Sequence, residues 1–291
     1  MPLSKINLSE KRNFGDQFTT TFLFIKQEFK SILVAFAILI VPLILVELFL
    51  QSYLVKDVIP GMTDSILEQG TKGRLFPLFV TYLLTLILAF WLQLFGVAYL
   101  RLYVDQYKAG EEIKITWQEL LKVMWRYLGK VLRLNVIYLL VIVVGVVFFI
   151  IPGIYVAVIF MFGIYFMMIR DKKMSSAFAA SVDLCHGQWW SLFGYLILFQ
   201  LIVSMLNYVF LLPFIVVMAK NYFTGGTSGV FELKIVTFIG QLGRYLMNMI
   251  LVVGIGVRFF SSLEGKEHQT LLDKIGQIGS EEQVAESEEK L

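Results

Sequence analysis

The residues that could carry chemistry are few and widely spaced. The chain has two histidines, His186 and His268, and one cysteine, Cys185, and no ligand or catalytic pattern surrounds them. The sequence contains no catalytic triad order, HExxH motif, phosphate-binding loop or dinucleotide-binding fingerprint. Gly254 and Gly256 fit close helix packing better than phosphate binding. A single cysteine also excludes an intrachain disulfide. We therefore expect no catalytic, cofactor or metal site, and predict that the protein is not an enzyme.

Four polar residues inside apolar runs are the candidates for a functional role. Glu47 lies near the end of the first run, and Arg244 interrupts the last one. A charge inside a membrane is costly and marks a functional position by default, although both residues could reach the far interface. Gln200 and Asn207 lie in the fifth run, where interhelical hydrogen bonding is the alternative to a substrate path. The main uncharged polar residues in or beside the runs are Gln93, Asn135, Gln200, Ser204, Asn207 and Asn248.

The composition places the chain in a membrane. Of its 291 residues, 58% are hydrophobic and only 16% are charged, and the mean hydropathy is +0.75. A soluble domain of this size needs more charges to cover its surface. The net charge of +3 is small, and no basic polar domain is present, so we expect no nucleic-acid partner. The expected partner is the lipid bilayer.

The apolar runs predict an all-α integral membrane bundle with about six transmembrane helices. Each run is long enough, or nearly so, for a hydrocarbon core of about 30 Å. Pro152-Gly153 predicts a tight turn between the third and fourth spans. Because 154–169 is short, a re-entrant pair is the alternative to a full hairpin. The six expected spans are 31–51, 76–100, 136–151, 154–169, 190–209 and 245–260.

Two prolines and one loop complete the expected connections. Pro42 should kink the first span, and Pro213 should break the long apolar run that follows residue 190. Residues 52–75 read as a loop that contains a short helix. That helix would place Met62, Ile66 and Gln69 on one face.

Three amphipathic helices are expected on the cytoplasmic side, at 14–30, 116–130 and 175–189. In the first, Asp16 should act as the N-cap. Large apolar residues, four of the five aromatic, recur there every three or four positions: Phe14, Phe18, Phe22, Ile25 and Phe29. That stripe fits contact with lipid or with the bundle. In the second, Thr116 and Glu119 should form a capping box. In the third, one face should carry Phe178, Val182, Cys185 and Trp189.

The distribution of basic residues predicts the orientation. Most of the 25 Lys and Arg residues fall in segments that would share one side of six spans, so both termini should be cytoplasmic. No cleaved signal peptide is expected. The expected domains are a cytoplasmic N-terminal segment at 1–30, a six-span domain at 31–262 and a polar cytoplasmic tail at 263–291. The tail should be disordered after about residue 279.

One resemblance is carried by the hairpin and the helix after it. The pattern IIPGIY, then an apolar run, then SSAFAASVDLCHGQWWSLFG, resembles poorly characterised bacterial multi-span membrane proteins of the glycerophosphoryl diester phosphodiesterase membrane-domain family. The ending RFFSSLEGKEHQTLLDKIGQIG is similar to versions in Bacteroidetes-type bacteria. The matching positions are Pro152, Gly153, Ala177, Ser181, Gly187, Trp190 and Phe193.

The resemblance implies a multi-pass protein of the bacterial inner (plasma) membrane. Where the family hydrolyses phosphodiesters, a separate soluble barrel with paired acidic and histidine residues supplies the activity. This sequence has no segment of that kind, so hydrolysis is not expected here.

Two functions from different classes fit these observations. The first is a non-enzymatic inner-membrane protein that organises or assists membrane or envelope components, with membrane-protein partners bound through the amphipathic helices. The alternative is a small-molecule or lipid transporter that uses Arg244 and the uncharged polar residues. An intramembrane enzyme would require Glu47, Arg244 and a histidine to meet, and the expected topology places the histidines on the opposite side.

Overall fold

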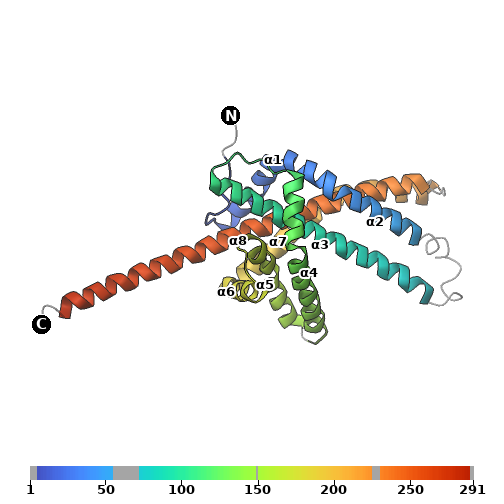
Figure 1. The fold of residues 1–291 in the computed structure, drawn as a ribbon. Helices are drawn as coiled ribbons and strands as arrows, with labels where there is room; N and C mark the ends of the chain where they lie inside the picture. The colour runs from blue at the N-terminus through green and yellow to red at the C-terminus, as the bar shows by residue number, and fades with distance from the viewer. Residues whose placement is uncertain (1–4, 55–71, 149, 225–229, 289–291) are drawn as a thin grey trace.

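The computed structural model confirms the all-α prediction for the part of the chain that it describes (Figure 1). The described residues are 5–54, 72–148, 150–224 and 230–288. Their helices are α1 (Phe14–Leu39), α2 (Val41–Leu54), α3 (Lys72–Ala109), α4 (Trp117–Phe148), α5 (Ile150–Ile169), α6 (Met174–Cys185), α7 (Trp189–Thr224) and α8 (Val230–Glu288). The short helix expected around 62–69 lies outside these residues.

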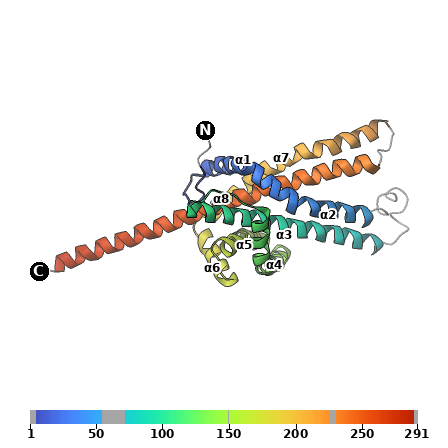
Figure 2. The ribbon, with the colours of Figure 1, turned by 45° about the horizontal axis from the view of Figure 1, so that its top comes forward.

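Several helices have the length and composition of membrane spans. In the described ranges, α3, α4, α5, α7 and α8 qualify singly, and the bent pair of α1 and α2 would make a sixth span. The chain is therefore a helical protein with apolar helices that can cross a bilayer. The end of α2 lies beside the start of α3, and both helices run with α7 and the first half of α8 in one general direction (Figure 2).

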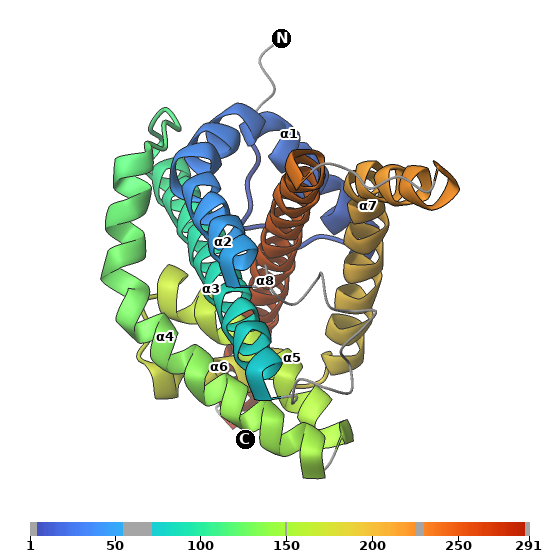
Figure 3. The same cartoon turned by 90° about the vertical axis from the view of Figure 1, so that its right-hand side faces the viewer.

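Helix α8 lies at the centre of the packing. Helices α1, α3 and α7 all pack against it, and Figure 3, which looks along the bundle, shows it between α3 and α7. The hydroxyl of Tyr195 donates to the carbonyl of Gly254 at 3.0 Å. A Cβ atom on Gly254 would lie 2.4 Å from the ring of Phe199, and one on Gly256 would lie 2.3 Å from Leu100. Close packing at these two glycines is thus confirmed.

The first two helices are joined at the predicted kink. Helices α1 and α2 differ in direction by 42°, and Pro42 stands directly after the break, where it removes a backbone donor. The N-cap of α1 is Asn13, and Asp16 lies in the first turn. The prediction of Asp16 as N-cap is therefore wrong by three positions, although a carboxylate in the first turn still favours the helix dipole. Helix α1 continues without a break through residue 30.

The aromatic stripe of α1 packs partly on α7. The ring of Phe18 stacks on Phe199 with centroids 5.3 Å apart, and Phe14 meets Tyr195 edge-on at 5.7 Å. Phe29 remains 55% exposed. The stripe therefore serves bundle packing at its start and leaves its later part available for lipid.

The prediction of a turn at Pro152-Gly153 is wrong, because both residues lie inside α5. Helix α4 ends at Phe148 and α5 begins at Ile150, so Pro152 lies in the first turn of α5, where its missing N–H costs no hydrogen bond. Gly153 is buried in the helix, and a Cβ on Gly145 would lie 2.7 Å from its Cα. Gly153 therefore allows α4 and α5 to approach closely, and it is not part of a turn. The hairpin extends across the direction of α2, α3 and α8 (Figures 1 and 3).

The capping box of α4 is confirmed. The backbone N–H of Glu119 donates to Thr116 Oγ1 at 3.4 Å, and the backbone N–H of Thr116 donates to the Glu119 carboxylate at 3.2 Å. These two bonds satisfy donors that the first turn of a helix otherwise leaves free.

Helix α6 differs from its prediction in length and in face. It ends at Cys185, and the backbone turns at Gly187, with φ of +76°, before Trp189 opens α7. Phe178 and Val182 are each 38% exposed. Small residues allow α6 to lie close to α5, so the buried face is offset from the predicted one. Its buried residues are Ala177, Ser181, Leu184 and Cys185.

The last two helices are longer than predicted. Helix α7 continues through Pro213, where the sequence predicts a break, because membrane helices tolerate proline when neighbours satisfy the freed carbonyl. Helix α8 is continuous for 59 residues and passes residue 279 as a helix, so the predicted disorder there is wrong. The tail is rich in Glu, Gln and Lys, which have high helix propensity.

A polar cluster connects α3 and α4 with the segment that follows α5. Arg101 of α3 donates to both carboxylate oxygens of Asp171, at 2.8 and 3.1 Å, and also to the carbonyl of Met168 at the end of α5. Tyr127 of α4 donates to the same carboxylate. Asp171 has a positive φ of 50°, which aspartate tolerates better than most residues.

We expect this cluster to make part of the stability depend on acid pH. Hydrogen bonding from Arg101 holds the pKa of Asp171 below its ordinary value. The stabilisation is therefore complete above the ordinary aspartate pKa and is lost as the pH falls through the lowered one. In detergent unfolding experiments, Asp171→Asn should cost about 1 kcal/mol at pH 7, since Asp171 is half exposed and water screens the pair. The cost should become smaller as the pH falls below the ordinary aspartate pKa. The exposed Glu111→Gln is the control. An Asp171→Asn difference that stayed constant with pH would contradict this assignment.

Candidate functional site

A buried carboxylate joins three helices at the end of the bundle away from the chain termini. Glu47 of α2 is 1% exposed. It accepts hydrogen bonds from Gln51 Nε2 at 3.1 Å, from Thr85 Oγ1 of α3 at 2.8 Å and from the Tyr245 hydroxyl of α8 at 2.9 Å. Three donors satisfy most of the lone pairs of a carboxylate. Glu47 is thus a structural acceptor that fixes α2, α3 and α8 relative to one another.

Arg244 is connected to this carboxylate through one side chain. Its Nη2 atom donates to the hydroxyl of Tyr245 at 3.1 Å, and its guanidinium lies 4.9 Å from the centre of the same ring. Tyr245 therefore bridges Arg244 to Glu47. Among the described residues, no carboxylate oxygen lies within 4.0 Å of Arg244. The guanidinium keeps donors that the network does not use.

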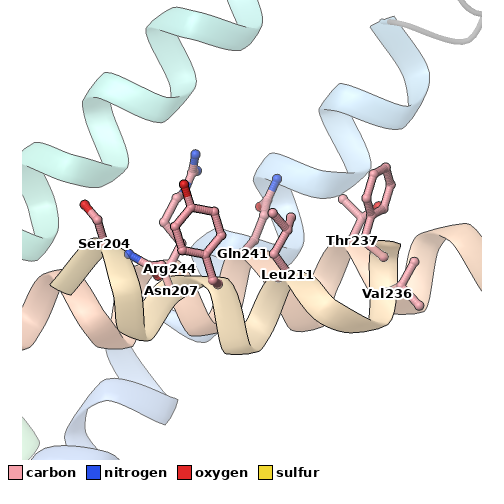
Figure 4. A pocket seen from close by; sticks show the side chains of 10 residues that line it. Ser204, Asn207, Leu211, Val236, Thr237, Gln241 and Arg244 are labelled. Atoms are coloured by element: carbon pink, nitrogen blue, oxygen red, sulfur yellow. The ribbon is translucent and has the colours of Figure 1, made fainter. Parts of the chain in front are cut away.

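A partly open cavity of about 460 Å³ lies between α7 and α8 beside this network (Figure 4). Its walls mix polar groups with apolar ones, the latter including Phe214. Figure 4 shows side chains of both helices lining it: Ser204, Asn207 and Leu211 from α7, and Val236, Thr237, Gln241 and Arg244 from α8. The cavity, which will be called the α7–α8 cavity, thus has a single charged wall residue.

Two amide oxygen atoms of residues that line the α7–α8 cavity have no hydrogen-bond partner among the described residues. They are Oδ1 of Asn207 and Oε1 of Gln241, and both are buried. The amide nitrogen of Gln241 donates to Gln51 at 3.0 Å, so this residue is held by the Glu47 network. Buried acceptors are normally satisfied. The α7–α8 cavity therefore offers one cation and two free acceptors.

The structure brings together three of the four residues singled out from the sequence. Glu47, Arg244 and Asn207 belong to one connected region. Gln200 does not line the cavity. Its amide donates to Ser204 of the same helix at 3.3 Å, so this bond is intrahelical, whereas interhelical bonding was expected. His186 lies elsewhere, so the condition for an intramembrane enzyme, a histidine beside Glu47 and Arg244, is not met within the described residues.

Sequence reasoning missed several members of the site: Gln51, Thr85, Gln241 and Tyr245. One signal was available, because Gln241, Arg244 and Asn248 recur at spacings of three and four and so share a helix face. Gln51 likewise follows Glu47 by four residues. Nothing in the sequence distinguishes Thr85 or Tyr245 from similar residues elsewhere.

The described residues hold no group of three or more His, Cys, Asp or Glu side chains placed to bind a metal ion. The lining of the α7–α8 cavity provides a cation, amide and hydroxyl groups, and an apolar wall. Such a wall with a few convergent polar groups is typical of ligand-binding sites of about this size.

The family model of a domain of unknown function (DUF7847) matches residues 120–263. The match covers slightly less than half of the chain and includes both walls of the α7–α8 cavity, but not Glu47. It provides no link to the glycerophosphoryl diester phosphodiesterase membrane-domain family. No curated protein and no solved structure matches the chain.

Proposed function

We propose that this chain is a non-enzymatic multi-span membrane protein that binds an anionic, lipid-like amphiphile in the α7–α8 cavity. The observation that carries the proposal is Arg244, which lines the cavity and has no carboxylate within 4.0 Å among the described residues. The match to a domain of unknown function is compatible with this role and does not define it.

Charge balance supports an anionic ligand. A cation within membrane-spanning helices is expensive unless it is paired. Glu47 already accepts hydrogen bonds from three neutral side chains, those of Gln51, Thr85 and Tyr245. Its carboxylate therefore forms no direct ion pair with Arg244. An anion in the α7–α8 cavity would supply the missing partner through charge-assisted hydrogen bonds.

The remaining wall supports a ligand with both polar and apolar parts. Asn207 and Gln241 line the cavity, and each has a buried amide oxygen without a hydrogen-bond partner among the described residues. A small rotation of either side chain would bring this acceptor to a hydroxyl or amine of the ligand. Leu211, Phe214 and Val236 line the same cavity and suit an acyl chain or a similar apolar group. An acidic lipid with a hydroxyl-bearing headgroup has all three features.

The proposal refines the idea of a protein that organises membrane components. Its setting would be the bacterial inner membrane, with both termini cytoplasmic and the α7–α8 cavity toward the far side. Lipid-facing parts of α1, α4 and α6 would provide further contact with lipid or with membrane-protein partners.

Lipid binding should depend on Arg244. In nanodiscs or by native mass spectrometry, phosphatidylglycerol should bind about 10- to 100-fold more weakly to Arg244→Gln than to wild type, as expected for one lost charge-assisted contact. Asn207→Leu should weaken it less. The matched control is Lys234→Gln, an exposed charge on the same helix. Equal affinity of Arg244→Gln and wild type would exclude the proposed site.

Transport is the second candidate, since the cavity is partly open and lies beside a network that joins α2, α3 and α8. Proteoliposomes with fluorescent phosphatidylglycerol in one leaflet separate the two roles. Flux that Arg244→Gln abolishes would assign transport, whereas binding without flux would assign a holding role.

A further inference from the structure

A second cavity, of about 340 Å³, lies where α8 leaves the other helices. Three segments that are distant in the sequence form it: residues 11–17, the connection 186–188 between α6 and α7, and residues 258–266 of α8. Figures 1 and 2 show the beginning of α1 and the end of α6 on either side of α8 at this point. On the predicted topology this cavity, called here the basal cavity, faces the cytoplasm.

The basal cavity is lined by four cationic side chains and by no carboxylate: Lys11, Arg12, Arg258 and Lys266. Two of these have acidic partners outside the lining. Arg12 pairs with Glu10 at 2.9 Å, and Lys266 pairs with Asp183 at 3.1 Å. Lys11 and Arg258 have no carboxylate within 4.0 Å among the described residues. The lining thus carries an excess of positive charge.

Arg258 is the central feature of the basal cavity. It is 7% exposed, and its guanidinium donates only to neutral groups, Gln17 at 3.2 Å and Ser191 at 2.9 Å. Its Nε atom has no hydrogen-bond partner in the described structure. A buried cation without an anion is strongly unfavourable, and replacing water by neutral acceptors compensates only part of that cost.

A second buried polar group lies one turn further along α8. Ser262 is 7% exposed, and its hydroxyl has no partner among the described residues. Gln188, which also lines the basal cavity, stands directly before the first residue of α7. The N-terminus of a long helix adds backbone donors and a partial positive charge to the same place.

We propose that the basal cavity binds a phosphate group, carried either by a lipid headgroup or by a soluble phosphate ester. A phosphate presents several acceptor oxygens and up to two negative charges, which suits cations and hydroxyl donors that converge from three segments. The bound phosphate would neutralise Arg258 and connect the N-terminal segment, the α6–α7 connection and α8. This inference does not depend on the α7–α8 cavity.

The test uses the full chain, purified and placed in phosphatidylcholine nanodiscs. Glycerol 3-phosphate and phosphatidylglycerol are the two probes, and binding is measured by calorimetry and by the unfolding temperature. Lys11→Gln removes an exposed lining charge and should weaken binding about tenfold without loss of the fold. Arg258→Gln should weaken it by at least as much. Lys108→Gln, an exposed charge outside the lining, is the control for both probes and should leave binding unchanged. Arg244→Gln should leave the binding of glycerol 3-phosphate unchanged, and phosphatidylglycerol is tested in the Arg244→Gln background, where the α7–α8 cavity is weakened and binding at the basal cavity is followed.

Each outcome decides the proposal. Binding of glycerol 3-phosphate that Lys11→Gln weakens assigns a soluble phosphate ester. Binding of the lipid alone, weakened in the same way, assigns a headgroup site. If neither probe raises the unfolding temperature, or if Lys11→Gln and Lys266→Gln both bind as wild type does, the proposal is wrong. These two lysine variants keep the test valid if Arg258→Gln fails to fold.

Discussion

Glu47→Leu is expected to lower the free energy of unfolding by about 2–4 kcal/mol. The carboxylate accepts from Gln51, Thr85 and Tyr245, and a leucine of similar size removes this acceptor from all three donors. Thr85 can still donate to the carbonyl of Thr81 at 3.2 Å, so the donors that lose their acceptor are those of Gln51 and Tyr245. Each buried donor without a partner costs about 1–3 kcal/mol, and partial relaxation reduces the total. Thermal or denaturant unfolding in detergent measures the change.

Two companion variants separate lost hydrogen bonds from lost packing. Glu47→Gln keeps an acceptor oxygen and should cost about half as much as leucine. Adding Tyr245→Phe to Glu47→Leu removes one stranded donor, so the double variant should be more stable than the sum of the single effects predicts. Strict additivity would show that Glu47 and Tyr245 do not interact as the 2.9 Å contact indicates.

Gly243→Ala is expected to separate α7 from α8. A Cβ at this position would lie 2.0 Å from Cγ and 2.3 Å from Cβ of Phe210. These atoms are close to the backbone of α7, so a side-chain rotation cannot relieve the overlap. Overpacking of this kind costs about 1–3 kcal/mol, and here the upper part of that range is expected. Because Gly240 and Arg244 line the α7–α8 cavity on either side of position 243, the affinity for lipid should fall as well.

The matched control for Gly243 is Gly194, on α7. A Cβ there meets nothing within 4 Å, so Gly194→Ala should be neutral or up to about 1 kcal/mol more stable, since alanine favours helix. Phe210→Ala removes the overlapping ring but keeps the Cβ atom 2.3 Å away, so it should restore only part of the stability lost in Gly243→Ala. Equal stability of Gly243→Ala and Gly194→Ala would contradict the close approach of the two helices.

Much of the architecture was predictable because it depends on local patterns. Apolar runs predicted the long helices, Pro42 predicted the kink, and Thr116 with Glu119 predicted a helix start. The errors also have local causes. Pro152 and Pro213 were read as breaks, but a first-turn proline loses no hydrogen bond and a proline in a membrane helix is tolerated.

The candidate site was predictable only in part. Glu47 and Arg244 stood out because a charge in an apolar run is rare. Their connection through Tyr245 depends on how α2, α3 and α8 are rotated against each other, and helix periodicity does not define that rotation. The basal cavity was not predicted for a related reason. Lys11 lies more than 240 residues before Arg258 and Lys266 in the sequence, and each of the three residues on its own looks like an ordinary surface charge.

Helix α8 is continuous and lines both the α7–α8 cavity and the basal cavity. Arg244 and Arg258 are fourteen residues apart on it, which corresponds to a rise of about 21 Å and a rotation of about 40°. A helix without a break transmits an axial shift or a turn along its whole length. The two cavities therefore share one rigid element, and a displacement of α8 at one arginine would be carried along the helix to the other.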